Sequence, residues 1–314
     1  MDPSFKIFSG TSNPTLAQAI CDFLDVPLSA CRHKRFSDDE MFVEIGENVR
    51  GADVFVVQST SQPASEHLME LLIMVDALKR ASARSICVVM PYYGYARQDR
   101  KVAPRTPITA KLVGDLLQAA GTTRVLAVDL HAAQIQGFFS VPFDHLFARP
   151  VLIEHMRAHF APGSSVVVSP DAGGVERARA YAKRLGGTLA IIDKRRPRAN
   201  EAQVMNIVGE VRDLDAVIVD DMVDTAGTLV EAAHALAGAG ARSVSAYATH
   251  AVLSGPAFSR IAAAPIDRVV VTDTIVLTDQ GRAQPKVEVL PIGALIAKAI
   301  RRIHLGESVS SLFA

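Results

Sequence analysis

The chain has 314 residues, of which 49% are hydrophobic and 21% charged, and its 33 Lys and Arg residues balance 33 Asp and Glu residues. This length and composition predict a well-packed protein of two ordinary domains, and the balanced charge excludes a global field that would attract nucleic acid or a membrane surface. The three cysteines form no C-x-x-C pair, no apolar run approaches the ~18 residues of a membrane span, and the first residues do not resemble a signal peptide, so we expect a cytoplasmic protein without a disulfide framework.

Short apolar runs rich in β-branched residues alternate with longer helical patterns along the chain. Continuous apolar runs, rather than alternating ones, are typical of parallel strands that helices cover on both faces. Pro142 and Pro150 interrupt the pattern, so we predict two doubly wound parallel-sheet α/β domains, residues 1–147 and 148–314. The predicted strands cover residues 53–58, 85–91, 124–129, 165–170, 188–193, 216–221, 243–250, 268–274 and 287–291. Ligands of such sheets bind beyond the carboxyl ends of the strands, so the residues after each run are the candidate site residues.

A long polar segment, residues 92–112, follows the second of these strands. It shows no periodicity until Thr106 and Pro107, which are typical of the N-cap and the first position of a helix. The segment carries the basic residues Arg97, Arg100, Lys101 and Arg105. Its length and charge favour a lid that closes over an anionic substrate, and plain disorder is the alternative.

Two further strand ends carry groups that bind metals or phosphates. Asp129 and His131 lie two residues apart, so in an extended chain their side chains would point the same way. A carboxylate beside an imidazole suits a metal or phosphate site, although a single histidine is about as often structural. Asp171 precedes a glycine pair, which fits either a ligand site or a tight turn that its carboxylate caps.

A basic run follows the strand at 188–193. It comprises Lys194, Arg195, Arg196 and Arg198. The ordinary explanation is a solvated basic turn. The alternative is that these cations lie at the same sheet edge as a group of acids and bind polyphosphate with them.

The strand at 216–221 runs into the densest acidic cluster of the chain. Asp220, Asp221 and Asp224 crowd three like charges into five residues, and a turn of small residues, 225–228, then opens an apolar helix. The N–H groups and the positive dipole end of that helix suit a phosphate, and the acids suit sugar hydroxyls or a divalent cation. The alternative is an acidic turn in which Asp224 or Thr225 is the N-cap.

Several of these segments occur together in one enzyme family. "VIVDDMVDTAGT" resembles the phosphoribosyl-pyrophosphate loop of type I phosphoribosyltransferases. "RFSDDE", "PYYGYARQDRK", "DLHAAQIQGFF", "SPDAGGVERA" and "DKRRPRANEAQVMNIVG" resemble class I ribose-phosphate diphosphokinases, also called phosphoribosyl pyrophosphate synthetases, in the right order. The resemblance runs from near residue 5 to the end and implies two domains of type I phosphoribosyltransferase-like architecture.

The resemblance implies a reaction. The pyrophosphoryl group of Mg-ATP moves to the C1 hydroxyl of ribose 5-phosphate and gives phosphoribosyl pyrophosphate and AMP. The alternatives are a non-catalytic regulatory subunit of the family and a phosphoribosyltransferase. The lid arginines, His131, Lys194 and Arg196 count against the first. The segment "RFSDDE", which resembles the family's adenine-binding motif, the lid and the Lys194–Arg196 pair count against the second.

The resemblance also implies roles for particular residues. Lys194 and Arg196 would be catalytic, and His131 and Asp171 would belong to the magnesium site. The ATP-binding residues would be Phe36, Asp38, Asp39, Glu40, Arg97, Gln98 and Asp99. The ribose 5-phosphate-binding residues would be Arg196, Asp220, Asp221, Asp224, Thr225, Ala226, Gly227 and Thr228.

Assembly and control follow from the same resemblance. The family forms homo-oligomers, typically hexamers, in which a neighbouring subunit lends the adenine motif. It is activated by inorganic phosphate and inhibited by ADP, and the regulatory phosphate site would comprise Arg50, Ser82, Ser308 and Ser310. The chain departs from the family at Asp39, where a glycine is usual, and at Ala103 and Pro104, where a basic and a small polar residue are common.

Overall fold

The computed structural model describes residues 5–195 and 204–313 and divides them into two compact units. The first unit runs to Phe147 and includes Thr274–Val276 and the segment from Pro291 onward, and the second comprises Ala148–Asp273 and Leu277–Leu290. The predicted second domain included all of residues 148–314, whereas in the structure the segment from Pro291 onward, with the C-terminal helix, belongs to the first unit. That helix packs against the first helix of the chain, a pairing of distant segments that local periodicity does not reveal.

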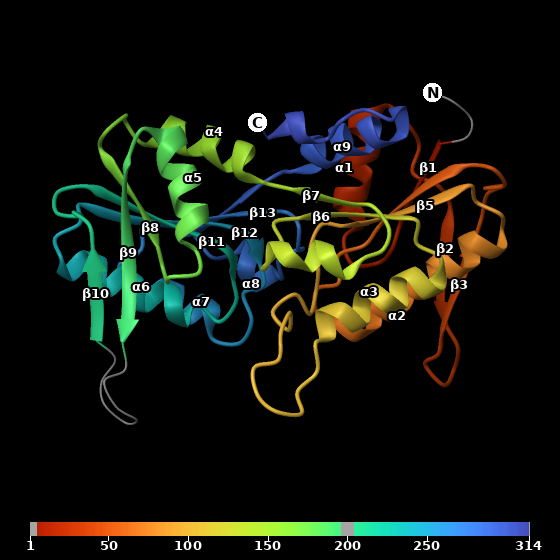
Figure 1. Cartoon of the computed structure of the whole chain (residues 1–314), viewed down its shortest axis with the longest axis horizontal. Coiled ribbons are helices and arrows are strands. Elements are labelled where there is room, and N and C mark those ends of the chain that lie inside the picture. The colour runs from red at the N-terminus through yellow and green to blue at the C-terminus, as the bar shows by residue number, and fades with distance from the viewer. Residues whose placement is uncertain (1–4, 196–203, 314) are drawn as a thin grey trace. The chain divides into compact units, whose positions relative to one another are not determined.

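The first unit is built on a five-stranded parallel sheet of order β1-β4-β5-β6-β7. Its strands are β1 (Phe5–Ser9), β4 (Asp53–Val57), β5 (Ser85–Met90), β6 (Arg124–Val128) and β7 (Phe143–Leu146). Helices α1 (Pro14–Leu24) and α9 (Gly293–Leu305) cover one face, and α2 (Ala64–Arg80) and α3 (Thr109–Ala120) cover the other (Figure 1). Short 3-10 turns, η1 (Ala133–Phe138) and η2 (Ser310–Leu312), complete the unit.

A separate antiparallel hairpin also belongs to this unit. Strand β2 (Cys31–Arg35) pairs with β3 (Met41–Ile45), and Lys34 lies opposite Phe42 in the register. Both strands are half-exposed and β2 is mostly basic, so they lack the continuous apolar run that indicates a buried parallel strand.

The second unit has a seven-stranded sheet of order β10-β9-β8-β11-β12-β13-β14, parallel except for the β9–β10 pair. Its strands are β8 (Ser165–Ser169), β9 (Thr188–Arg195), β10 (Val204–Val208), β11 (Asp215–Val223), β12 (Ser243–Ala251), β13 (Arg268–Thr272) and β14 (Val287–Leu290). Helices α4 (Arg149–His159) and α5 (Val175–Leu185) cover one face (Figure 1). Helices α6 (Gly227–Gly238) and α7 (Ala257–Ala263) cover the other, and α8 (Asp279–Arg282) is a single turn.

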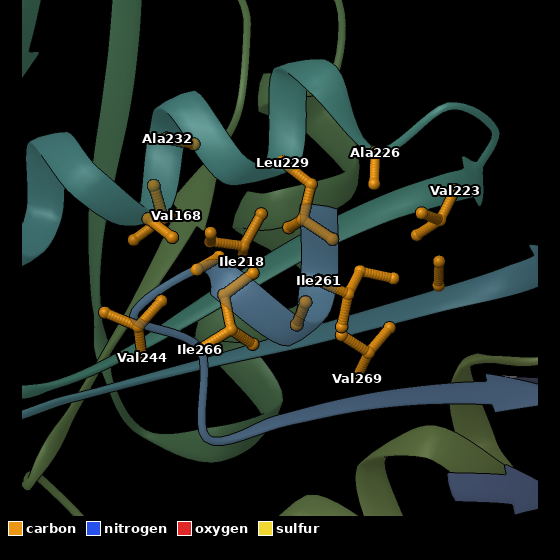
Figure 2. Close-up of a cluster of buried hydrophobic side chains, with 14 of the residues drawn as sticks. Val168, Ile218, Val223, Ala226, Leu229, Ala232, Val244, Ile261, Ile266 and Val269 are labelled. Atoms are coloured by element: carbon orange, nitrogen blue, oxygen red, sulfur yellow. The ribbon is translucent and has the colours of Figure 1, made fainter. Parts of the chain in front are cut away.

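A buried apolar core packs α6 against the sheet. Leu229 and Ala232 of the helix pack toward Ile218 of β11 and Val244 of β12, and Ala226 belongs to the same buried cluster (Figure 2). Burying a leucine side chain contributes roughly 1.5–3 kcal/mol. The acidic loop between β11 and α6 is therefore held between two buried elements.

All nine predicted strands are confirmed, most of them to within a residue or two at each end. The strands β1, β7 and β10 and the hairpin were missed. The predicted helix start at Thr106 is wrong, because α3 begins at Thr109 with Ile108 as its N-cap. The Thr106 hydroxyl instead donates a 2.7 Å hydrogen bond to the Ala103 carbonyl and closes a turn.

Candidate functional site

The acidic loop lies at the topological switch point of the second sheet. Strand β8 has β9 on one side and β11 on the other, and the chain order reverses between β8 and β11. Crevices form at such reversals, beyond the carboxyl ends of the strands. Asp171 follows β8, and Asp220, Asp221 and Asp224 lie at the end of β11, so the fold brings four predicted site residues to one edge.

Arg177 on α5 partly neutralises the acids. Its Nη1 lies 3.0 Å from Asp220 Oδ1 and 3.1 Å from Asp221 Oδ1. The Asp221 N–H also donates to Asp220 Oδ1 at 2.9 Å. Burial, and next the charge of Asp221, raise the pKa of Asp220 to about 8. The Asp220 carboxyl therefore favours a proton at neutral pH until a cation or a hydroxyl donor replaces it.

The turn after the acids has the backbone of an anion-binding loop. Ala226 is in the left-handed region at φ 57°, and α6 begins at the next residue, Gly227. Arg260 donates a 2.9 Å hydrogen bond to the Thr225 carbonyl, and a Cβ at Gly227 would lie 3.4 Å from its guanidinium. A helix N-terminus, a tight backbone and a nearby guanidinium together suit a phosphate.

The alternative that Asp224 or Thr225 caps α6 is wrong. The N-cap is Ala226, and no side chain caps it. Asp224 instead accepts a short hydrogen bond from the Ser254 hydroxyl. Thr225 and Thr228 are exposed, so the first turn of α6 is accessible from solvent in this unit.

The other predicted metal residues have different surroundings. Asp171 Oδ1 accepts the Gly174 N–H at 2.9 Å, so the carboxylate caps its turn while the residue stays exposed. Asp129 has φ 39°, so the chain is not extended there, and the argument that it and His131 point the same way is wrong. His131 is an exposed residue of the first unit, whereas Asp171 belongs to the second. Within the described ranges, no three His, Cys, Asp or Glu side chains are arranged to hold a metal.

The basic run lies at the margin of the described structure. Strand β9 extends further than predicted and includes Lys194, which lies opposite Met205 of β10 in the register. Arg196 and Arg198 lie outside the described residues.

The hairpin tip carries the predicted adenine motif. The Phe36 N–H donates to the Glu40 carbonyl at 2.9 Å, and the Asp39 N–H donates to the Phe36 carbonyl at 3.0 Å. Asp39 has φ 71°, a conformation that glycine adopts easily, and its carboxylate lies 2.9 Å from Arg35 Nη1. The turn therefore keeps a glycine-like backbone although the residue is aspartate. Phe36 is 57% exposed at this tip.

The start of the predicted lid is fixed more firmly than its middle. Gln98 donates its N–H to the Tyr95 carbonyl at 2.9 Å and accepts the Ala110 N–H on its own carbonyl at 3.1 Å. Asp99 accepts a 2.8 Å hydrogen bond from Gln134, and Arg97 is exposed. Residues 101–105, which include Ala103 and Pro104, are all exposed.

The predicted regulatory residues lie in two places within the first unit. Arg50 and Ser82 are exposed and occupy adjoining turns, where the Gly51 N–H donates to the Ser82 carbonyl at 2.9 Å. Ser308 and Ser310 are exposed after α9, and Arg302 donates to the Ser308 carbonyl at 2.8 Å.

Fold and loop together define a doubly wound α/β protein with a loop suited to an anion at its sheet reversal. Comparison with known proteins gives the family. Residues 5–121 match the N-terminal domain of ribose phosphate pyrophosphokinase, and residues 195–314 match the phosphoribosyl synthetase-associated domain. The ribose-phosphate pyrophosphokinase of Brucella melitensis biotype 1 is 55% identical, with 98% of this chain and 99% of the relative covered. That of Maricaulis maris is 56% identical over the same shares.

A solved structure agrees. The crystal structure of phosphoribosylpyrophosphate synthetase from Mycobacterium smegmatis is 42% identical, covers 96% of this chain and 99% of its own, and has a TM-score of 0.91. The chain belongs to the ribose-phosphate pyrophosphokinase family. The predicted fold class, the predicted family and the prediction of a ribose-phosphate diphosphokinase are confirmed.

Three residues of the candidate site were not found from the sequence. Arg177, Ser254 and Arg260 contact the acids or the loop, but each comes from a helix or turn remote in sequence. The only sequence signal was the general expectation that crowded acids need cationic partners. None of the arginines in α5 was distinguishable from the others by periodicity.

Proposed function

We propose that the two units divide the substrates of the pyrophosphokinase reaction between them. The second unit binds ribose 5-phosphate and the first binds the adenine nucleotide. The pyrophosphoryl group of ATP moves to the C1 hydroxyl of ribose 5-phosphate, giving phosphoribosyl pyrophosphate and AMP. The observation that carries the proposal is the uncapped α6 N-terminus directly beyond the Asp220–Asp221 pair at the sheet reversal.

Ribose 5-phosphate fits this loop by charge and by hydrogen bonding. The N–H groups from Thr225 to Thr228 would bind the 5-phosphate, and the neighbouring Arg260 supports a negative charge there. Asp220, Asp221 and Asp224 would accept hydrogen bonds from the ribose hydroxyls. Those hydroxyls would add hydrogen-bond donors to the acid pair that Arg177 already contacts.

The adenine nucleotide fits the exposed hairpin tip and the lid start. Phe36 presents an exposed ring for stacking, and Asp38 and Glu40 are exposed acceptors on the same turn. Gln98 and Asp99 are held by hydrogen bonds, which fix the backbone beside Arg97. The exposed Arg97 is therefore placed to reach a phosphate.

ATP would enter as a magnesium complex. Mg²⁺ keeps several waters and binds through one or two carboxylates together with substrate phosphates, so it requires no closed protein cage. The exposed Asp171 at the sheet reversal fits such a ligand, and the exposed His131 of the first unit is the other residue that the family resemblance assigns to magnesium. When bound, the ion supplies positive charge to the phosphate oxygens.

The chemistry requires cations more than it requires a base. The C1 oxygen attacks the β-phosphorus, the bond from that phosphorus to the α–β bridging oxygen breaks, and AMP leaves with that oxygen while the hydroxyl proton passes to water. Negative charge grows on the bridging oxygen and on the transferring group. Lys194 and Arg196 would stabilise that charge.

Assembly and control complete the proposal. The chain would form a homo-oligomer, a hexamer, in the cytoplasm, with phosphate as activator and ADP as inhibitor at Arg50, Ser82, Ser308 and Ser310. Hydroxyls beside a guanidinium suit a phosphate group. None of the helices in the described part of the chain is both long and apolar enough to cross a bilayer.

Product analysis tests the reaction. The chain is incubated with ATP, Mg²⁺ and ribose 5-phosphate, and the phosphorus NMR spectrum is followed. We expect AMP and phosphoribosyl pyrophosphate in equal amounts. ADP as the product would indicate an ordinary kinase, and no turnover at any phosphate concentration would indicate a regulatory subunit.

A further inference from the structure

Two ion pairs join the β2–β3 hairpin to helix α2. His33 Nδ1 lies 2.7 Å from Glu70 Oε1, and the Arg35 guanidinium contacts the Glu66 carboxylate. The two basic residues are two positions apart on a strand, which separates them by about 6.6 Å. The two acids are four positions apart on a helix, or about 6 Å. The spacings match, so the pairs form a ladder of two rungs between the strand and the helix.

The His33–Glu70 pair is the inner rung of this ladder, and Glu70 connects it to the rest of the first unit. Its side chain is only 7% exposed. It accepts hydrogen bonds from the Thr11 N–H at 3.1 Å, the Thr11 hydroxyl at 2.7 Å and the Gln58 amide at 2.6 Å. Thr11 follows β1 and Gln58 follows β4, so one carboxylate ties the hairpin to the carboxyl ends of two strands.

The pKa shifts of both members of the inner rung favour their charged forms. Hydrogen bonds to Cys31 and to Glu70 raise the pKa of His33 to about 10. Burial alone would raise the pKa of Glu70, but hydrogen bonds from His33 and Thr11 outweigh it and hold that pKa below its usual range. A charged pair with one buried partner is costly to break from either side.

Apolar packing holds the base of the hairpin. Cys31, Val43 and Ile45, near its base, pack against the core of the first unit. Further out, a cavity of about 240 Å³ separates it from α2, with Met41, Phe42 and His67 among its lining residues. Close packing therefore fixes the base, and the ladder spans the gap that packing leaves.

We propose that His33 and Glu70, with Arg35 and Glu66 as the outer rung, are positioning residues that hold the hairpin tip at the angle at which it meets the nucleotide. The inference rests on the proposed role of Phe36, Asp38 and Glu40 in binding the adenine nucleotide. The ladder would act on nucleotide affinity and leave ribose 5-phosphate binding and the chemical step unchanged.

The first test is steady-state kinetics of single variants of the full chain. His33→Gln should raise the KM for ATP roughly tenfold, because the tip loses its fixed angle, while kcat and the KM for ribose 5-phosphate change less than about twofold. His33→Lys keeps a cation on the strand and should recover most of the lost affinity. Glu66→Gln, at the exposed outer rung, should raise the KM for ATP about threefold.

A double-mutant cycle isolates the inner rung. If the pair acts as a unit, His33→Gln with Glu70→Gln should cost no more than the worse single change. If Glu70→Gln does not fold, the outer-rung and His33→Lys variants still decide the question. Hydrogen exchange should show faster exchange at 32–44 in His33→Gln and unchanged exchange in β4 and β5.

The matched control lies on the same hairpin. Arg32 and Glu44 lie opposite each other in the register and form an exposed pair at 3.5 Å. Glu44→Gln removes a charge from the hairpin without touching α2, so it should leave the KM for ATP unchanged.

The Phe36→Ala variant shows whether a negative result overturns the positioning role of the ladder or the nucleotide-binding role of the hairpin tip. If Phe36→Ala raises the KM for ATP and His33→Gln does not, the positioning role is overturned and the nucleotide role of the tip stands. If Phe36→Ala has no effect, the proposed nucleotide role itself fails. If His33→Gln raises both KM values equally or lowers kcat in parallel, the ladder is a general stabiliser and the inference is overturned.

Discussion

The β11–α6 loop and the β2–β3 hairpin have opposite designs. The loop is short, lies between a buried strand and a buried helix, and offers backbone groups whose positions the core fixes. The hairpin is long and half-exposed, and ion pairs hold its outer half across a cavity. The loop suits a small rigid anion, and the hairpin suits a larger ligand that is covered only when bound.

The difference extends to electrostatics. At the loop, like charges are crowded around one arginine, so a ligand that brings hydroxyls or cations relieves repulsion. At the hairpin, opposite charges are already paired, so the proposed nucleotide-binding geometry would be set before the ligand arrives. We therefore expect changes at the loop to respond strongly to ligands and pH, and changes at the hairpin to act mainly on nucleotide affinity.

The largest effect should come from Lys194, which follows the apolar part of β9 in the same unit as the loop. Lys194→Ala should lower kcat about a hundredfold or more, close to 3 kcal/mol of barrier, since it removes a cation from the transferring group. The KM for ribose 5-phosphate should hardly change. Lys183→Ala, an exposed lysine on α5, is the control, and near-normal turnover in Lys194→Ala would remove that residue from the mechanism.

A smaller effect on activity is expected from changes in the C-terminal tail. The tail would regulate the whole enzyme, and would belong to neither the β11–α6 loop nor the β2–β3 hairpin. Ser310→Ala should shift the phosphate concentration for half-maximal activation upward by roughly tenfold, because a hydrogen bond to a charged group is lost. Ser311→Ala serves as the control, since its hydroxyl contacts Arg302 instead. Identical activation curves for all three proteins would exclude the tail from regulation.

The acid pair should make the stability of the free protein depend on pH. The folded pKa of Asp220, about 8, lies above the ordinary value of 3.8, so the stability this group contributes is complete below about pH 4 and is lost as pH rises toward 8. Asp220→Asn removes the charge, so it should raise Tm by a few degrees near pH 8.5 and by less near pH 5.5. The effect is modest because 32% of the side chain is exposed.

A Tm difference that is the same at both pH values would show that the pair does not titrate in this range. The measurement is differential scanning calorimetry without Mg²⁺ or substrate. Asp279→Asn, at a 98% exposed carboxylate in the same unit, provides the reference slope.

The smallest effect should come from the hairpin turn. Asp39→Gly relieves the left-handed backbone, worth up to about 1 kcal/mol, but it also loses the exposed pair with Arg35 and adds chain entropy. These terms nearly cancel, so the free energy of unfolding should change by less than about 1 kcal/mol, as denaturant titration would measure. A change of several kcal/mol would mean that the Arg35–Asp39 pair is a main support of the tip.

The sequence predicted the buried part of the fold well because a parallel sheet covered on both faces produces continuous apolar runs. Strand β11 is an example, with residues 216–219 all buried. The hairpin was missed because "CRHKR" has no apolar run, and its partner strand alternates weakly. The position of α9 in the first unit was missed because it depends on contact with α1, almost the whole chain away.

At the candidate site, sequence patterns located charges but not their partners. The three acids of the loop were evident, whereas Arg177 could not be distinguished among the arginines of its helix. Glu70 was not singled out from the sequence. It lies inside "LMELLIMV", where the neighbouring Met69 is 52% exposed, so the run alone does not show whether the carboxylate is buried. The fold identifies His33 as its partner.

The central claim is that the loop binds the sugar phosphate and the hairpin binds the nucleotide. It is tested most directly by measuring both KM values in Asp224→Ala and Phe36→Ala, with Ser254→Ala as the control that removes only the hydroxyl bonded to Asp224. We predict that Asp224→Ala raises the KM for ribose 5-phosphate at least tenfold and changes the KM for ATP less than about twofold. Phe36→Ala should raise the KM for ATP at least tenfold and change the KM for ribose 5-phosphate less than about twofold. Parallel increases in both KM values for either variant, or the reverse assignment, would contradict the account.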